Sequence, residues 1–167
     1  MKDTMKDFFS FPEVVNEISA RLVAFGVLSM ALLSLVLINT NNTYTPILLL
    51  ILLYGFLART SSGPKISPLA LLVTRIIVPK LNLGDKPVPG PPKRFAQSIG
   101  LVFSLLILVS WFSVNIALAN TLLIILASFA FLESALGYCF GCKVFKLLIR
   151  AGLLPEDICE KCSTLEY

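Results

Sequence analysis

The four cysteines are the residues of this chain best suited to chemistry, and they fall into two pairs with the same spacing. Cys139 and Cys142 form one CxxC motif, and Cys159 and Cys162 form the other. Sixteen residues separate the two pairs. Three interpretations are open: thiol–disulfide redox or sulfur chemistry, a four-thiolate metal site, and cysteines without a chemical role.

The redox hypothesis rests on where the first CxxC lies. At the start of a helix, backbone N–H groups and the helix dipole lower the pKa of a thiol and favour the reactive thiolate. Lys143 follows this motif directly and adds a positive charge. Cys139 would then attack and Cys142 would resolve the mixed disulfide. Cys159 and Cys162 would relay electrons or sulfur from a soluble thioredoxin-like or rhodanese-like partner.

The metal hypothesis rests on the distance between the two pairs. Two CxxC motifs about 15–20 residues apart are typical of zinc bound by four cysteines, and the same four thiolates suit an iron–sulfur cluster. Such a site would make the protein a non-catalytic membrane scaffold or accessory subunit. Much of the intervening segment has the pattern of an amphipathic helix, which a zinc ribbon does not use.

The composition indicates the environment of the chain as a whole. Hydrophobic residues make up 56% of the 167 residues, charged residues 14%, and the mean hydropathy is +0.86. Globular proteins carry about 25% charged residues, so the composition predicts a protein whose first partner is the lipid bilayer. The chain has no histidine, which excludes a Ser-His-Asp triad and a histidine metal site. We expect no nucleic-acid partner.

Four apolar stretches are candidates for membrane spans, at residues 22–38, 46–58, 95–111 and 116–136. A spanning helix needs roughly 20 apolar residues, so the second stretch, with 13, is marginal. The fold class predicted is an all-α membrane protein. Its four transmembrane helices form two repeated hairpins, each followed by a cytosolic amphipathic helix.

The distribution of charge predicts the orientation. Basic residues gather in the segment 59–94 and after residue 139, whereas the hairpin turns 39–45 and 112–115 carry no charge. Basic segments stay on the cytoplasmic side. We therefore expect a multi-pass protein of the plasma membrane with both termini in the cytoplasm. The apolar residues of the segment 8–18 predict a short interfacial helix.

The two halves share a pattern at an offset of 74 residues, which aligns Ser67-Pro68, a helix start, with the end of the first CxxC. The first CxxC would thus begin an amphipathic helix over about 143–153. We predict a single membrane domain, 1–167, and describe its parts by range: a first hairpin unit (1–82), an extended, solvated Pro/Gly linker (83–94), a second hairpin unit (95–154) and a cytosolic Cys-containing tail (155–167). A second copy of the chain is a candidate partner.

Glu133 is the only acidic residue inside a predicted span. Such residues are costly in a bilayer and are either paired or functional. Arg21 is the candidate partner for a structural pair. The alternative is a small transporter with Glu133 on the path of a proton or substrate. Gln97, in the third stretch, is predicted to hydrogen-bond between helices.

Three segments carry a resemblance to a known family: 92–97 (PKRFAQ), 131–142 (FLESALGYCFGC) and 63–68 (GPKISP). On these motifs the chain resembles, over roughly residues 12–150, the small membrane proteins of domain-of-unknown-function family 4395. The resemblance implies a four-span bacterial or archaeal membrane protein with no established activity. Cys139 and Cys142 match its motif, whereas Cys159 and Cys162 lie beyond it, which favours a dithiol over a four-cysteine metal site.

Overall fold

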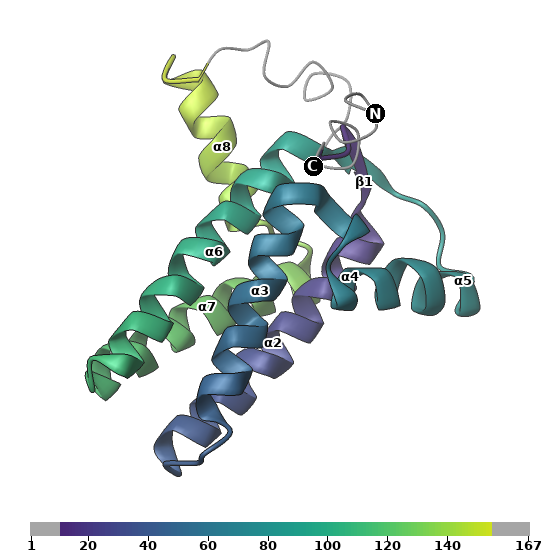
Figure 1. The fold of residues 1–167 in the computed structure, drawn as a ribbon. Coiled ribbons are helices and arrows are strands. Elements are labelled where there is room, and N and C mark those ends of the chain that lie inside the picture. The colour runs from purple at the N-terminus through teal and green to yellow at the C-terminus, as the bar shows by residue number, and fades with distance from the viewer. Residues whose placement is uncertain (1–10, 155–167) are drawn as a thin grey trace, which may run out of the picture.

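The computed structural model describes residues 11–154, and almost all of its regular structure is helical (Figure 1). The elements in chain order are β1 (Val14–Asn16), α2 (Glu17–Asn39), α3 (Thr45–Ser62), a 3-10 turn (Gly63–Lys65), α4 (Pro68–Leu72), a π-helical stretch (Val73–Ile77), α5 (Val78–Lys80), β2 (Pro87–Pro89), α6 (Gly90–Phe112), α7 (Ile116–Leu136) and α8 (Phe140–Arg150).

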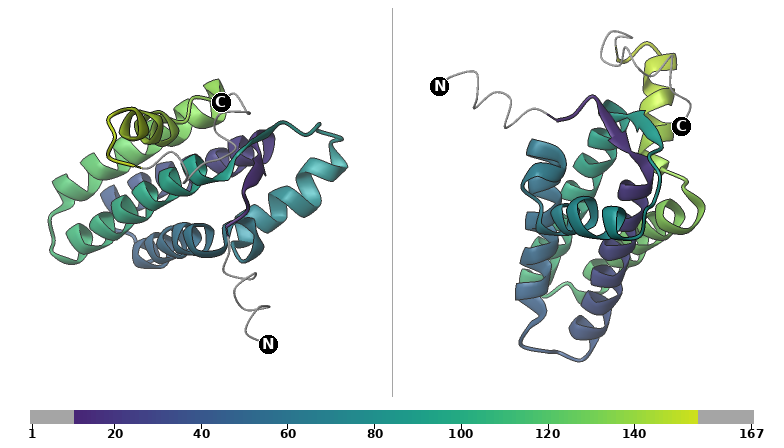
Figure 2. Two further views of the ribbon diagram at one scale, coloured as in Figure 1. Left: turned by 90° about the horizontal axis from the view of Figure 1, so that it is seen from above. Right: turned by 90° about the vertical axis from the view of Figure 1, so that its right-hand side faces the viewer.

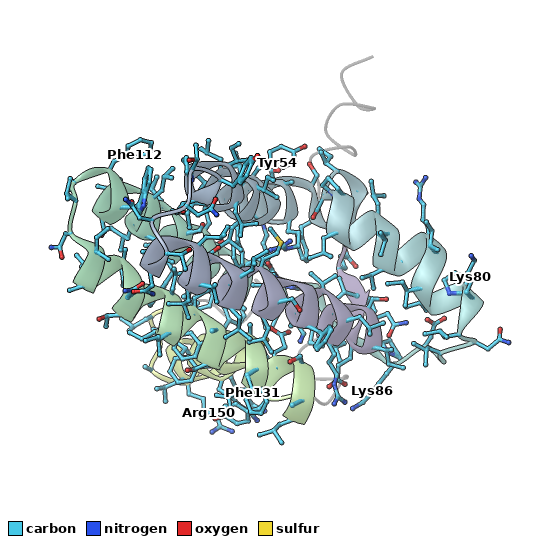
Figure 3. The ribbon with its side chains drawn as sticks, turned by 90° about the horizontal axis from the view of Figure 1, so that it is seen from below. Tyr54, Lys80, Lys86, Phe112, Phe131 and Arg150 are labelled. Carbon is cyan, nitrogen blue, oxygen red and sulfur yellow. A yellow bond between two sulfur atoms is a disulfide. The ribbon has the colours of Figure 1, made fainter. Side chains whose placement is uncertain are left out.

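Four of these helices, α2, α3, α6 and α7, are long and apolar enough to cross a membrane. This confirms the predicted number of spans. The marginal second stretch is extended to a sufficient length because α3 includes Thr45 at its start and residues 59–62 at its end. Tyr54, Phe112 and Phe131 lie on the outer surface of the bundle (Figure 3), as side chains in contact with lipid would.

The four long helices form a bundle in which α2 packs mainly on α7, and α6 contacts both α3 and α7 (Figure 2). Its core contains large apolar side chains such as Leu49, Ile107 and Leu123. Ala31 on α2 and Ala119 on α7 have no exposed surface. Small residues at such positions let two helix backbones approach closely, which is how helices associate in lipid.

The two turns between the paired helices lie where the sequence predicts them. Asn41 and Val114 take the left-handed conformation there, with φ of 50° and 59°. Asn39 and Asn120 exchange side-chain hydrogen bonds of 3.1 and 3.4 Å. The two uncharged turns are therefore joined at one end of the bundle, and all the remaining connections lie at the other end.

Two predictions near the start of the chain and in the linker are wrong. Val14–Asn16 is not part of an interfacial helix but a strand, paired antiparallel with Pro87–Pro89. The linker is extended only up to Pro89, because α6 already begins at Gly90. The prolines at 91 and 92 do not prevent this, since the first turn of a helix has no need of their missing N–H groups.

The helices that follow the two hairpins point in different directions. The run of α4, the π-helical stretch and α5 leaves the side of the bundle, whereas α8 extends beyond its end (Figures 1 and 2). Lys80 lies at the tip of α5, far from the bundle (Figure 3). The predicted repeat stays a prediction about the pattern of the sequence.

Candidate functional site

The first CxxC lies at the start of α8, as the sequence predicts. Helix α7 ends at Leu136, and Gly137 takes the left-handed conformation with φ of +67°, which closes the helix and redirects the chain. Tyr138 and Cys139 cross to the next helix. Cys139 is the N-cap of α8, so α8 begins three residues earlier than the predicted start at Lys143.

A disulfide joins Cys139 to Cys142. The backbone N–H of Cys142 also donates a hydrogen bond of 3.3 Å to Sγ of Cys139. Cys139 is 7% exposed and Cys142 only 2%. The sulfur of Cys139 thus accepts a hydrogen bond that a helix terminus offers, which is the arrangement that stabilises a thiolate when a disulfide is reduced.

Tight contacts hold the first turn of α8 against the bundle. A Cβ added at Gly141 would lie 2.6 Å from Cβ and 2.7 Å from Cα of Ala96, so the two backbones are in direct contact there. Phe140 stacks on Phe129 of α7 with ring centroids 4.8 Å apart. The cysteine pair is therefore fixed relative to α6 and α7.

A cavity of about 60 Å³ inside the bundle reaches this turn. Its walls include Cys139, Phe140 and Gly141, and also Gln97 and Glu133. A cavity of this size, lined by polar as well as apolar side chains, has room for water. It links the disulfide to the carboxylate that the sequence analysis singles out.

A second cavity, of about 140 Å³, also borders the disulfide. Both cysteines line it, together with Lys93, Lys143 and Glu17. Lys143 is exposed, and its ammonium nitrogen lies 5.9 Å from the centre of the Tyr138 ring. Cys139 therefore borders two cavities, one shared with Gln97 and Glu133 and the other with Lys93 and Lys143.

Glu133 is paired, but with a different residue from the one predicted. Its Oε1 lies 2.7 Å from Nζ of Lys93, and both side chains are largely buried. Arg21 instead donates to the backbone carbonyl oxygens of Ser134 and Ala135, at 3.3 and 2.9 Å. The last carbonyls of a helix need such donors, and α6 brings Lys93 to Glu133 because it starts five residues before the predicted span.

Gln97 does hydrogen-bond between helices, and its partner is a residue that the sequence analysis missed. Its Oε1 accepts a hydrogen bond of 2.8 Å from Nε of Arg59, which joins α6 to α3. Arg59 is only 5% exposed. An arginine three residues before the end of α3 looks like an ordinary interfacial residue in the sequence, and its burial depends on the packing of α6.

Cys159 and Cys162 lie outside the described residues. Within residues 11–154, no group of three or more Cys, Asp or Glu side chains is placed to hold a metal ion. A site that uses all four cysteines therefore stays a prediction.

Comparison with known proteins identifies a family. The family model described as "Domain of unknown function (DUF4395)" matches residues 15–150, which include the whole bundle and the first CxxC. No curated protein matches the chain, and no solved structure does. By this match over most of its length, the chain belongs to the DUF4395 family.

Proposed function

We propose that the protein is a membrane-embedded thiol–disulfide oxidoreductase in which Cys139 and Cys142 are the redox pair. One observation carries the proposal: a disulfide at a helix start, in which Cys139 borders two cavities of an apolar helical bundle. A purely structural disulfide between residues three apart closes a very small loop, which adds little to stability. A disulfide that forms and breaks reversibly is a better explanation of why Cys139 and Cys142 lie at this helix start.

The exchange reaction needs only the two cysteines and a partner with its own cysteine pair. In the reduced protein, the Cys139 thiolate attacks a disulfide sulfur of a thioredoxin-like partner, and the partner's other sulfur leaves as a thiolate. The Cys142 thiolate then attacks Sγ of Cys139 and displaces the partner. Two electrons pass to the partner, and the Cys139/Cys142 pair becomes the disulfide. Cys159 and Cys162 are a second acceptor or donor of the same class.

The protons of this exchange have a nearby acceptor. Counted from two neutral thiols, the pair gives up two protons and two electrons when the disulfide forms, and it takes up the same when the disulfide is reduced. Glu133 and Cys139 line the same cavity, which has room for water. Glu133, held by Lys93, is therefore the group that we expect to exchange protons with Cys139 through that space.

The site lies at the basic end of the bundle, and we propose that this end faces the cytoplasm of the cell. The segment 59–94 and the residues after α7 carry 11 of the 14 basic side chains, whereas the turns at the opposite end carry no charge. Basic segments favour the cytoplasmic side. The helical run 68–80 and α8 would then be cytosolic amphipathic helices, and both chain termini would be cytoplasmic.

The test is a thiol count on the full-length protein in detergent at a series of dithiol/disulfide ratios. Alkylation followed by mass spectrometry would show Cys139 and Cys142 changing state together, at one midpoint. Variants C159S and C162S should keep this transition. A pair that stays oxidised at every ratio, or that never forms, overturns the proposal.

The same sample distinguishes the other two functions. Zinc and iron analysis should find well under one metal ion per chain if the cysteines are a redox pair. About one ion per chain, lost in every single Cys→Ser variant, would establish the four-thiolate scaffold instead. A transporter would keep its activity without cysteines and lose it in E133Q.

A partner of the stated class can be trapped directly. C142S leaves Cys139 unable to complete the exchange, so a mixed disulfide with thioredoxin should accumulate and disappear on reduction. C139S is the control and should trap much less, because Cys142 is the more deeply buried sulfur.

A further inference from the structure

We propose a second site, separate from the cysteines: a pocket at the end of α3 in which Arg59 binds an oxyanion, the phosphate or carboxylate group of an amphiphile. Two observations support this site. Arg59 is 5% exposed and one of its nitrogens has no hydrogen-bond partner among the described residues, and the same side chain lines a pocket.

The guanidinium group of Arg59 is fixed on three sides. Nε donates to Gln97 at 2.8 Å, and Nη1 donates to Oγ of Ser67 at 3.4 Å. The carbon of the group lies 4.6 Å from the centre of the Phe56 ring. The third nitrogen, Nη2, is buried and has no hydrogen-bond partner among the described residues. A buried donor without a partner is costly and rare.

The partners of Arg59 are also electrically neutral. The hydrogen bonds go to an amide and a hydroxyl, so neither cancels the positive charge. Glu133 acts on this charge across the bundle, but its carboxylate is bound by Lys93 at 2.7 Å. The buried carboxylate of Glu17 is likewise paired, with Lys86 at 2.6 Å. A buried charge calls for a counter-charge, and an oxyanion bound to Nη2 would supply it.

A pocket of about 250 Å³ adjoins the guanidinium group. This is close to the lower end of the range for small-molecule sites, about 300 Å³. Polar side chains line part of it: Asn16, Ser19, Thr74 and Gln97. The rest is apolar, including Val15, Val23 and Ala70. Walls of both kinds suit a charged head group attached to an apolar chain.

A second buried polar group lies on the same face of α3. Ser62 follows Arg59 by three residues, so the two side chains are neighbours on α3. Its hydroxyl is fully buried and also has no hydrogen-bond partner among the described residues. The end of α3 thus holds two unpaired polar atoms.

The position in the membrane indicates the source of the oxyanion. The pocket is bounded by α2, α3 and the run from α4 into the π-helical stretch, which leaves the side of the bundle at its basic end (Figure 1). Arg75 on that run is exposed. Basic side chains at this level attract anionic lipid head groups. Arginine binds phosphate and carboxylate through two N–H groups and so suits either.

Native mass spectrometry of the full-length protein in detergent tests the proposal with three probes: phosphatidylglycerol, oleate and inorganic phosphate. We expect one amphiphile to bind per chain, with affinity at least tenfold weaker in R59Q. R75Q, which removes an exposed charge outside the pocket, is the matched control and should bind as the unaltered protein does. Binding of inorganic phosphate with the same dependence on Arg59 would identify a free anion as the source.

A second variant tests whether weaker binding in R59Q comes from the pocket and not from loss of the fold. A20L keeps Arg59 and its partners but narrows the pocket, because Ala20 lies in its wall, and leucine is a good helix former. It should also weaken binding at least tenfold while the helical circular-dichroism signal is unchanged. If R59Q and A20L bind all probes as tightly as R75Q does, or if no probe binds, the proposal is wrong.

Discussion

The two helices that follow the hairpins each start at a residue that could cap them, but the two side chains have different partners. Ser67 is the N-cap of α4, and Cys139 is the N-cap of α8. The start of α4 lies beside a buried arginine with neutral partners, and the start of α8 lies beside a buried lysine paired with an acid. The hydroxyl of Ser67 accepts a hydrogen bond from Arg59 and makes no cap, whereas the sulfur of Cys139 caps its own helix.

The largest expected effect comes from making the second start resemble the first. C139S replaces the sulfur cap of α8 with a serine hydroxyl, and serine is among the preferred N-cap residues, so helix α8 should be retained. The disulfide with Cys142 cannot form, and thiol exchange should be lost completely. Alkylation and circular dichroism would measure the two results. If exchange survived in C139S, Cys142 would be acting with another cysteine.

The second-largest expected effect is a difference in stability cost between the two buried cations, Lys93 and Arg59. E133Q leaves Lys93 buried without a counter-charge, and removal of one partner of a buried pair costs about 3–5 kcal/mol. Q97L removes only a neutral partner of Arg59 and should cost less, about 1–3 kcal/mol. Unfolding in detergent by a denaturing surfactant would rank the two. An equal cost would mean that the pair at α8 is not more strongly coupled than the contact near α4.

A double variant provides the control for this ranking. Lys93→Met combined with E133L removes both charges, and it should recover most of the stability that E133Q loses. Failure to recover would show that Glu133 has a further partner in the bundle.

A smaller effect concerns how each following helix packs. Gly141 of α8 faces the backbone of Ala96, whereas a Cβ at Gly26 of α2 would meet only the tip of the Leu69 side chain of α4, at 2.7 Å. A flexible side chain can move, but a backbone cannot move without shifting a helix. G141A should therefore cost about 1–3 kcal/mol, and G26A less than about 1 kcal/mol. Thermal unfolding of both variants in detergent checks the order.

The smallest effect comes from an exposed charge near each site. K143Q should slow alkylation of the reduced Cys139 about twofold at low salt, and hardly at all at high salt, because an exposed charge is screened. R75Q should leave that rate unchanged, since Arg75 belongs to the other half. A slowing that persists at high salt would place Lys143 in direct contact with the thiolate.

The sequence alone predicts much of this architecture, and physical chemistry explains which parts. Apolar length predicts the four spans, and the spacing of the cysteines together with a helix pattern places Cys139 at a helix start. Polar residues inside spans must find partners, which predicts the role of Gln97. These inferences need only local pattern and the properties of lipid.

The remaining features depend on how distant segments meet. The pairing of Glu133 with Lys93 instead of Arg21 requires that α6 begins at Gly90 and packs on α7. The burial of Arg59 requires that α6 covers the end of α3. The strand at Val14–Asn16 exists only because residues 87–89 supply its hydrogen bonds. No local pattern contains this information.

The small sheet of β1 and β2 has a consequence for the order of assembly. Val14 pairs with Pro89, and Glu17 at the start of α2 pairs with Lys86 at 2.6 Å. About seventy residues, including the whole first hairpin, are synthesised between these partners. Contacts so distant in sequence close late, and a chain is made from its N-terminus. The first hairpin is therefore complete before the sheet can form, and the sheet can close only after residues 87–89 have been made.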